Sequence, residues 1–194
     1  MYVNLTVPQL EQLTALITKA WANIPPMAEN FKTIADKAKT MAIGEKYQDI
    51  ELMNPEGKMV KLSSCVPEGK YVMLEFWASW CGPCRAEIPH LKEAFEAYNG
   101  KGVEFLSVSI DKDGAAWRKA MKEENMPWAQ VQAPKAGKDV MKLYQFSGIP
   151  YILVLDQEGR IVGKNLRDKA LMDKLEEMVS GKKKESVAMP AMGM

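Results

Sequence analysis

The sequence predicts an α/β fold in which a central mixed sheet is flanked by helices. From residue 71 onward, segments of strand character alternate with segments of helical periodicity, which is the pattern of βαβ units. One strand segment, Tyr71–Trp77, is an almost continuous apolar run, as expected for a strand that is covered on both faces. We therefore expect a largely parallel sheet, with the last hairpin as its antiparallel edge.

Length and composition exclude several classes of protein. The 194 residues suffice for one domain with an appendage, and 47% hydrophobic with 26% charged residues is typical of a globular protein. A formal net charge of +1 gives no electrostatic reason to expect nucleic acid or an anionic membrane as a partner. Three cysteines cannot form a disulfide framework, so the fold must be stabilised by a packed core.

Targeting signals are not visible in the sequence. No apolar run approaches the roughly 20 residues that a membrane-spanning helix needs. The segment Met1–Thr6 has neither a basic stretch nor an apolar one, so no signal peptide is apparent. The sequence leaves open whether the protein is cytoplasmic or has lost a targeting segment.

Residues 1–43 should form a helical extension. Apolar side chains recur at helical spacing from Leu10 to Trp21, and Pro25-Pro26 should end that run. A second helix is expected over Met27–Met41. No chemistry is apparent in this part of the chain.

Residues 44–180 should form one domain that begins with a β-hairpin. Two short strands, Ile50–Leu52 and Met59–Leu62, flank the turn segment Asn54–Gly57. After the central strand we expect, in chain order, a helix over Pro83–Asn99, a strand over Val103–Ile110, a helix over Asp113–Asn125, a strand over Trp128–Val131, a helix over Lys138–Phe146, a hairpin of Tyr151–Leu155 with Arg160–Val162, and a helix over Asp168–Val179. Residues 181–194, which include three consecutive lysines, should be a disordered tail.

The chemistry is concentrated in Cys81-Gly82-Pro83-Cys84, which follows the buried strand and opens a helix. At a helix N-terminus the unpaired N–H groups and the macrodipole favour negative charge. A thiol placed there loses its proton more readily, and the thiolate is the nucleophile. The two-residue spacing lets the second sulfur resolve a mixed disulfide. We expect Cys81 to be the attacking thiolate and Cys84, one turn further in, to be the resolving thiol.

A zinc site is the alternative interpretation, because Cys-x-x-Cys also begins zinc knuckles. Such a site needs two further ligands, and the sequence offers only Cys65 and His90. The strand–motif–helix context favours the redox interpretation.

The segment Phe76–Arg85 (FWASWCGPCR), together with Ile149-Pro150 far downstream, resembles the thioredoxin superfamily. Three features make the chain similar to the TlpA/ResA-like group of bacterial thiol–disulfide oxidoreductases. These are the leading hairpin over Tyr47–Leu62, the extra helix and strand after Ile110, and the segment Glu87-Ile88-Pro89 just beyond the second cysteine.

The resemblance covers roughly residues 44–180 and implies a thioredoxin-like fold. It also implies cysteine-containing protein substrates, an upstream thiol electron donor, and a chemistry without metal, nucleotide or organic cofactor. Members of the group are mostly exported, so the resemblance implies a location in the bacterial periplasm.

Glu75 lies inside the apolar strand, where an isolated charge is costly, so its carboxyl should favour the protonated form. Beside a dithiol, such a group could take the proton that Cys84 must lose. The thioredoxin family often has a buried acid with this role here, although TlpA-like proteins vary at this position. The alternative is a carboxylate that reaches water at a sheet edge.

Glu87 lies one helical turn beyond Cys84 and should share its face of the helix. ResA-like proteins carry a glutamate at this offset near the active site. The alternative is an ordinary first-turn acid that complements the helix dipole.

A substrate-binding surface is expected around the cysteines. Pro150 precedes an apolar strand, where proline would normally interrupt pairing. By resemblance, the Ile149–Pro150 bond is cis and faces the cysteines, and it leaves the Ile149 backbone free to pair with a substrate segment. The alternative is a trans proline at the start of an edge strand. Trp80 should provide an apolar docking surface, unless it packs in the core, and Gly82 and Pro83 complete the predicted set.

The predicted function is therefore that of a protein-disulfide oxidoreductase, and of a reductase in particular. One alternative is a peroxiredoxin-like thiol peroxidase, but such enzymes have a threonine three residues before the peroxidatic cysteine, where this chain has Ala78. The other alternative is a non-catalytic binding module that keeps the thioredoxin fold.

Overall fold

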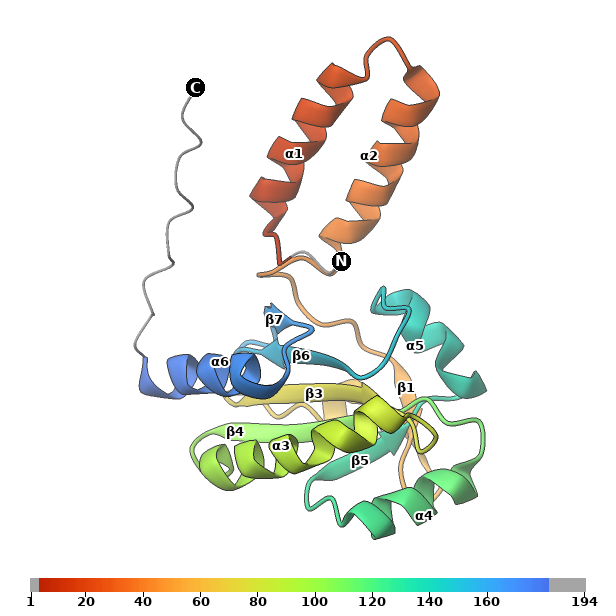
Figure 1. Cartoon of the computed structure of the whole chain (residues 1–194), viewed down its shortest axis with the longest axis vertical. Helices are drawn as coiled ribbons and strands as arrows, with labels where there is room; N and C mark the ends of the chain where they lie inside the picture. Colours follow the sequence, from red (N-terminus) through yellow and green to blue (C-terminus); the bar gives the residue numbers. More distant parts are fainter. Residues whose placement is uncertain (1–3, 182–194) are drawn as a thin grey trace.

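The structure, a computed structural model, describes residues 4–181 and confirms the α/β class (Figure 1). Two helices precede a seven-stranded sheet that is covered by further helices. The elements in chain order are α1 (Val7–Ala20), α2 (Pro25–Lys39), β1 (Glu51–Met53), β2 (Met59–Lys61), β3 (Tyr71–Trp77), α3 (Gly82–Tyr98), β4 (Val103–Ser109), α4 (Gly114–Glu124), β5 (Ala129–Gln132), α5 (Lys138–Leu143), β6 (Tyr151–Leu155), β7 (Ile161–Lys164) and α6 (Asp168–Ser180).

The sheet has the strand order β2-β1-β5-β4-β3-β6-β7 and is mixed. Strands β3, β4 and β5 are parallel, and β3 pairs with β4 along its whole length, from Tyr71 opposite Val103 to Trp77 opposite Ser109. The remaining strand pairs of the sheet are antiparallel: β1 with β2, β1 with β5, β3 with β6, and β6 with β7. The last hairpin, β6 with β7, forms an antiparallel edge as predicted, but the prediction that the sheet is largely parallel is wrong. The leading hairpin joins the opposite edge through β1 and β5, so antiparallel strands lie on both sides of the parallel centre.

Strand β3 lies at the centre of the core. From Val72 to Phe76 its apolar side chains alternate between two clusters, as the pleat requires. Met73 belongs to the cluster formed with α3 and α6, whereas Leu74 and Phe76 belong to the cluster that includes Trp117 of α4. Glu75 is two residues beyond Met73 and therefore lies on the face that α3 and α6 cover, which is the front face in Figure 1.

The N-terminal helices α1 and α2 form a hairpin beside the sheet (Figure 1). Pro25 and Pro26 begin α2, because proline is tolerated in the first helical turn. The helices pack through Trp21 and Phe31, whose ring centroids are 6.0 Å apart in an edge-on arrangement. The side-chain amide of Gln145 donates to a carbonyl of this hairpin, and so fastens it to the rest of the chain.

The division into domains at residues 43 and 180 stays a prediction, and the predicted tail lies almost entirely outside the described residues. Among residues 4–181, no helix is both long and apolar enough to cross a membrane.

Candidate functional site

The two cysteines lie where β3 leads into α3. Cys81 is the N-cap residue of α3, and its Sγ accepts a hydrogen bond of 3.1 Å from the backbone N–H of Cys84. The two residues form a disulfide, with their Cα atoms 5.2 Å apart. Cys81 is 5% exposed and Cys84 is fully buried, so the outer and inner order of the sulfurs follows the sequence prediction. The N–H group that contacts Cys81 would also stabilise a thiolate at that sulfur.

The loop that precedes β6 faces the outer sulfur. The carbonyl oxygen of Ile149 is 3.7 Å from the Cys81 Sγ. The Ile149–Pro150 bond is cis, as the resemblance implied. A residue 68 positions away in the sequence thus places its backbone directly against the predicted nucleophile.

Trp80, immediately before Cys81, is 68% exposed. The alternative in which its ring packs in the core is therefore wrong. Gly82 and Pro83 are also exposed, in the first turn of α3. A nearly buried sulfur is thus flanked by one large exposed aromatic side chain and by two residues without polar side chains.

Glu75 is fully buried in the middle of the sheet. Its Oε2 accepts a 2.6 Å hydrogen bond from Ser107, whose Oγ in turn accepts one of 2.8 Å from the indole of Trp128. Its Oε1 has no hydrogen-bond partner among the described residues. Burial raises the pKa of Glu75 to about 8, although the Ser107 hydrogen bond opposes the shift. The alternative of a carboxylate at a sheet edge is wrong, because β3 is paired on both sides.

Glu87 is 6% exposed and lies beyond the first turn of α3, which has no acidic residue, so the alternative of an ordinary first-turn acid is wrong. Its Oε1 accepts a 3.0 Å hydrogen bond from the backbone N–H of Asp168, where α6 begins. Burial raises the pKa of Glu87, and the hydrogen bond from Asp168 opposes that shift. Glu87 thereby fastens α6 to the helix that carries the cysteines.

Two further residues, Arg167 and Ser107, contact this site and were not predicted from the sequence. Arg167 donates a 2.6 Å hydrogen bond from Nη2 to the carbonyl of Pro150. It lies between β7 and α6, and no local pattern indicates its partner. Ser107 contacts Glu75 and could have been found, because it is a polar residue inside the apolar segment Val103–Ile110.

The candidate zinc ligands do not gather around the cysteine pair. His90 lies 3.5 Å from a carboxylate oxygen of Asp168, and Cys65 is a free thiol next to Ser64. Among residues 4–181, no group of three or more His, Cys, Asp or Glu side chains is arranged to hold a metal ion.

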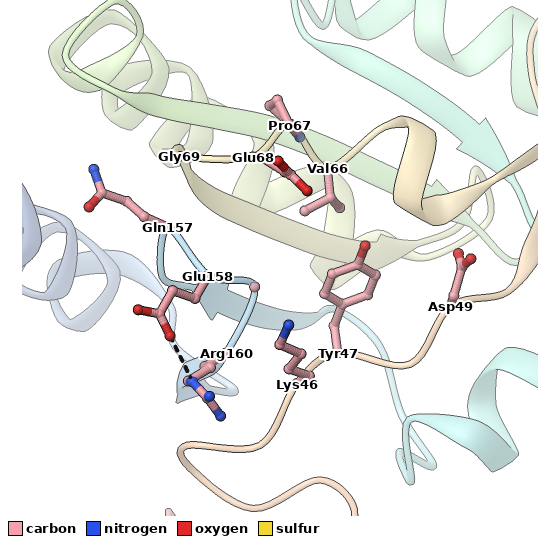
Figure 2. A pocket seen from close by; sticks show the side chains of 11 residues that line it. Lys46, Tyr47, Asp49, Val66, Pro67, Glu68, Gly69, Gln157, Glu158 and Arg160 are labelled. Atoms are coloured by element: carbon pink, nitrogen blue, oxygen red, sulfur yellow. Dashed lines mark hydrogen bonds and ion pairs between the residues drawn. The ribbon is translucent and has the colours of Figure 1, made fainter.

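A pocket of about 640 Å³ lies at the opposite end of β3 (Figure 2). It is bounded by residues 66–69 before that strand, by the β6–β7 turn at residues 157–160, and by the segment around Tyr47. Figure 2 shows Tyr47, Lys46 and Glu68 directed toward this hollow. None of the predicted site residues lines this pocket.

Comparisons with known proteins agree with this geometry. Residues 43–164 match the sequence model of the AhpC/TSA family. A thiol-disulfide oxidoreductase ResA from a strain of Bacillus cereus is 31% identical over 130 residues, which cover 67% of this chain and 72% of that protein. The thioredoxin domain of a thiol-disulfide oxidoreductase from Bacteroides vulgatus has a TM-score of 0.66 and 36% identity, with 71% of this chain and 98% of that chain covered. A thiol:disulfide interchange protein from Bacteroides sp. has a TM-score of 0.67 and 36% identity, covering 75% of this chain and 95% of its own.

Proposed function

The chain belongs to the AhpC/TSA family within the thioredoxin superfamily and is a thiol–disulfide oxidoreductase, and we propose that it acts as a reductase, with Cys81 as the attacking thiolate. The observation that carries the proposal is the position of the Cys81 sulfur. It caps α3, and it faces the backbone carbonyl of Ile149. A thiolate in that position is stabilised by the helix terminus and lies beside a backbone edge that an incoming segment can use.

The proposed reaction has two exchange steps. The Cys81 thiolate attacks one sulfur of a partner disulfide, the partner S–S bond breaks, and its other sulfur leaves as a thiolate that takes a proton from water. The resulting mixed disulfide is resolved when Cys84 loses its proton and attacks the Cys81 sulfur. The bond between Cys81 and the partner then breaks, and the partner's sulfur leaves as a thiolate that takes up the second proton. The partner has then gained two electrons and two protons, and the enzyme is left with the Cys81–Cys84 disulfide. An upstream thiol donor returns the electrons.

We assign Glu75 to the proton transfer of the resolving step. It lies two residues before the end of β3 and beneath α3, whose first turn carries the buried Cys84. Burial raises the pKa of Glu75 to about 8, so this carboxyl holds its proton at neutral pH yet lies within reach of releasing it, as a group that exchanges protons must.

The proposed substrates are extended, cysteine-containing segments of other proteins. The backbone of Ile149 would pair with such a segment, and the exposed ring of Trp80 would give it an apolar surface beside the sulfur. We also propose that the protein acts in the bacterial periplasm. Support for this location comes from the TlpA/ResA-like resemblance and from the bacterial sources of its relatives.

Insulin reduction by dithiothreitol tests the proposal. The wild-type protein should accelerate it, Cys81→Ser should abolish the acceleration, and Cys84→Ser should accumulate a mixed disulfide with the substrate. Cys65→Ser, which removes the free thiol, is the matched control and should keep full activity. Peroxide consumption by Cys84→Ser protein without insulin reduction would favour a peroxidase, and no acceleration at all would favour a binding module.

The direction of electron flow is tested by the reduction potential of the Cys81–Cys84 couple. A reductase should have a potential near that of thioredoxin, about −270 mV, whereas a value near the −120 mV or so of DsbA would overturn the assignment. The measurement is decisive because about 30 mV changes the equilibrium constant of a two-electron couple tenfold.

A further inference from the structure

Asp111, just beyond β4, is a buried aspartate that the reaction above does not use. It is 2% exposed, and its carboxylate accepts three hydrogen bonds. Oδ1 accepts from the Ser79 hydroxyl at 2.6 Å, and Oδ2 accepts from the Ser79 backbone N–H at 2.8 Å and from the Ser109 hydroxyl at 2.7 Å. Both oxygens of one carboxylate therefore contact Ser79, which lies two residues before Cys81.

The backbone of Asp111 is itself held from two strands. Its N–H donates to the Ser109 Oγ in β4 at 3.0 Å, and its carbonyl accepts from the Gln132 side chain in β5 at 2.8 Å. The backbone that carries the carboxylate is thus hydrogen-bonded to side chains of both β4 and β5.

Ser79 belongs to the tight turn that connects β3 to α3. The backbone N–H of Cys81 donates to the carbonyl of Ala78 at 3.0 Å, so Ser79 and Trp80 are the two central residues of this turn. The turn determines both where the Cys81 sulfur caps α3 and where the exposed Trp80 ring projects.

The Asp111 carboxylate binds the segment after β3 at the point where the backbones that follow β3 and β4 are no longer paired with each other. The last backbone bond between this pair of segments runs from the Ile110 N–H to the Trp77 carbonyl, at 2.8 Å. The N–H of Ser79, further along the same segment, finds the Asp111 side chain instead. Without this acceptor, the part-buried N–H and hydroxyl of Ser79 would lose their partner.

We propose that Asp111 is a positioning residue of the redox site, which acts through Ser79 to fix the turn that carries Trp80 and Cys81. The inference rests on the proposed function, because it assumes that Cys81 attacks the partner disulfide. Displacement of a reacting atom by about 1 Å can reduce a rate by up to about a hundredfold, so loss of the anchor should slow the first exchange step.

Two substitutions separate position from charge. Asp111→Ala removes all three acceptor contacts. Asp111→Asn removes the formal charge but keeps one acceptor oxygen for the Ser79 N–H, and its NH₂ group can donate to the Ser79 hydroxyl, which rotates to accept. A positioning role therefore predicts that asparagine rescues what alanine loses. Ser79→Ala, which removes one of the three bonds, should have an intermediate effect and tests the same contact if Asp111→Ala does not fold.

The control is Asp156→Ala, at the end of β6 that lies away from Pro150. The Asp156 carboxylate accepts hydrogen bonds from the backbone N–H groups of Glu158 and Arg160, so this substitution also removes hydrogen bonds from a turn. Reduced proteins are compared by their rate constants with oxidised glutathione and by the pH profile of Cys81 alkylation with iodoacetamide. Urea denaturation establishes that each protein is folded.

We expect the glutathione rate constant of Asp111→Ala to fall about tenfold and its alkylation profile to move to higher pH, because the sulfur leaves its place at the helix terminus. Asp111→Asn and Asp156→Ala should stay within about twofold of the wild type in both measurements. A folded Asp111→Ala protein with wild-type rates would overturn the inference, and so would an Asp111→Asn protein as slow as the alanine variant. An inactive wild-type protein, or an active Cys81→Ser protein, would instead refute the proposed function.

Discussion

Replacing Glu75 with glutamine should change how the stability of the oxidised protein depends on pH. Burial raises the pKa of this carboxyl from 4.5 to about 8. Because the folded state holds the proton more tightly than the unfolded state, the stability that this group contributes is fully present below pH 4.5 and is lost as the pH rises through 8. One pKa unit corresponds to about 1.4 kcal/mol, so the total loss should be about 5 kcal/mol.

Glutamine cannot ionise, so the variant should lack this loss. Its side-chain N–H groups, however, would replace Oε1, which has no hydrogen-bond partner among the described residues. Burying such a donor costs about 1–3 kcal/mol. Glu75→Gln should therefore be less stable than the wild type at pH 4 and more stable at pH 9, and the two curves should cross near about pH 6.

Urea denaturation at intervals from pH 4 to pH 9 measures both curves. The oxidised protein is used because Cys81 and Cys84 do not titrate in the disulfide. Glu51→Gln, on the exposed side of β1, is the matched control and should run parallel to the wild type. If the difference in unfolding free energy between Glu75→Gln and the wild type stayed constant across this range, Glu75 would ionise in the folded protein without penalty and the reasoning would be refuted.

Three further predictions concern contacts around the cysteines. Trp80→Ala should raise the KM for insulin several-fold and leave the rate constant with oxidised glutathione within about twofold of the wild type. An equal loss of activity toward insulin and toward glutathione would contradict a docking role for Trp80. Arg167→Met should lower kcat/KM for insulin about tenfold, because the hydrogen bond from the charged Arg167 side chain to the Pro150 carbonyl is lost. An unchanged kcat/KM would show that the loop of Ile149 and Pro150 keeps its position without this hydrogen bond. Glu87→Ala should lower the urea-unfolding free energy by about 1–3 kcal/mol, because the Asp168 N–H loses its acceptor, whereas Glu87→Gln keeps an acceptor and should lose less.

Elements with a strong local pattern could be predicted from the sequence. The bounds of β3, Tyr71–Trp77, agree with those of the apolar run in the sequence. A strand that is buried on both faces is apolar at nearly every position, so its two ends can be read from the sequence. The helix at the cysteines agrees to within one residue at each end, because a proline in its first turn and an apolar stripe specify it. By contrast, α5 ends at Leu143, three residues earlier than expected. The chain turns at Gln145, which has a φ of 56°, and a non-glycine residue in this conformation gives no sequence signal.

Strand pairing could not be predicted in the same way. A strand of three residues such as β1 carries no information about its distant partner, and the structure joins it to β5 through the single pair Met53 and Gln132. The same limit applies to the site. Glu75 was found because it interrupts its own apolar strand, but its partner Ser107 is opposite only in a particular register of β3 and β4. Asp111 and Arg167 contact segments 32 and 17 residues away, and neither contact follows a local periodicity.

The burial of the outer sulfur limits which disulfides can react. Cys81 exposes only 5% of its surface, and the carbonyl of Ile149 lies 3.7 Å from its sulfur. Exchange requires the attacking thiolate and both partner sulfurs to come into line, so under the proposed function the partner disulfide would have to reach the Cys81 sulfur beside the Ile149 carbonyl. The proposed preference for extended segments would therefore rest on the same placement of the Cys81 sulfur, at the N-terminus of α3 and beside the Ile149 carbonyl.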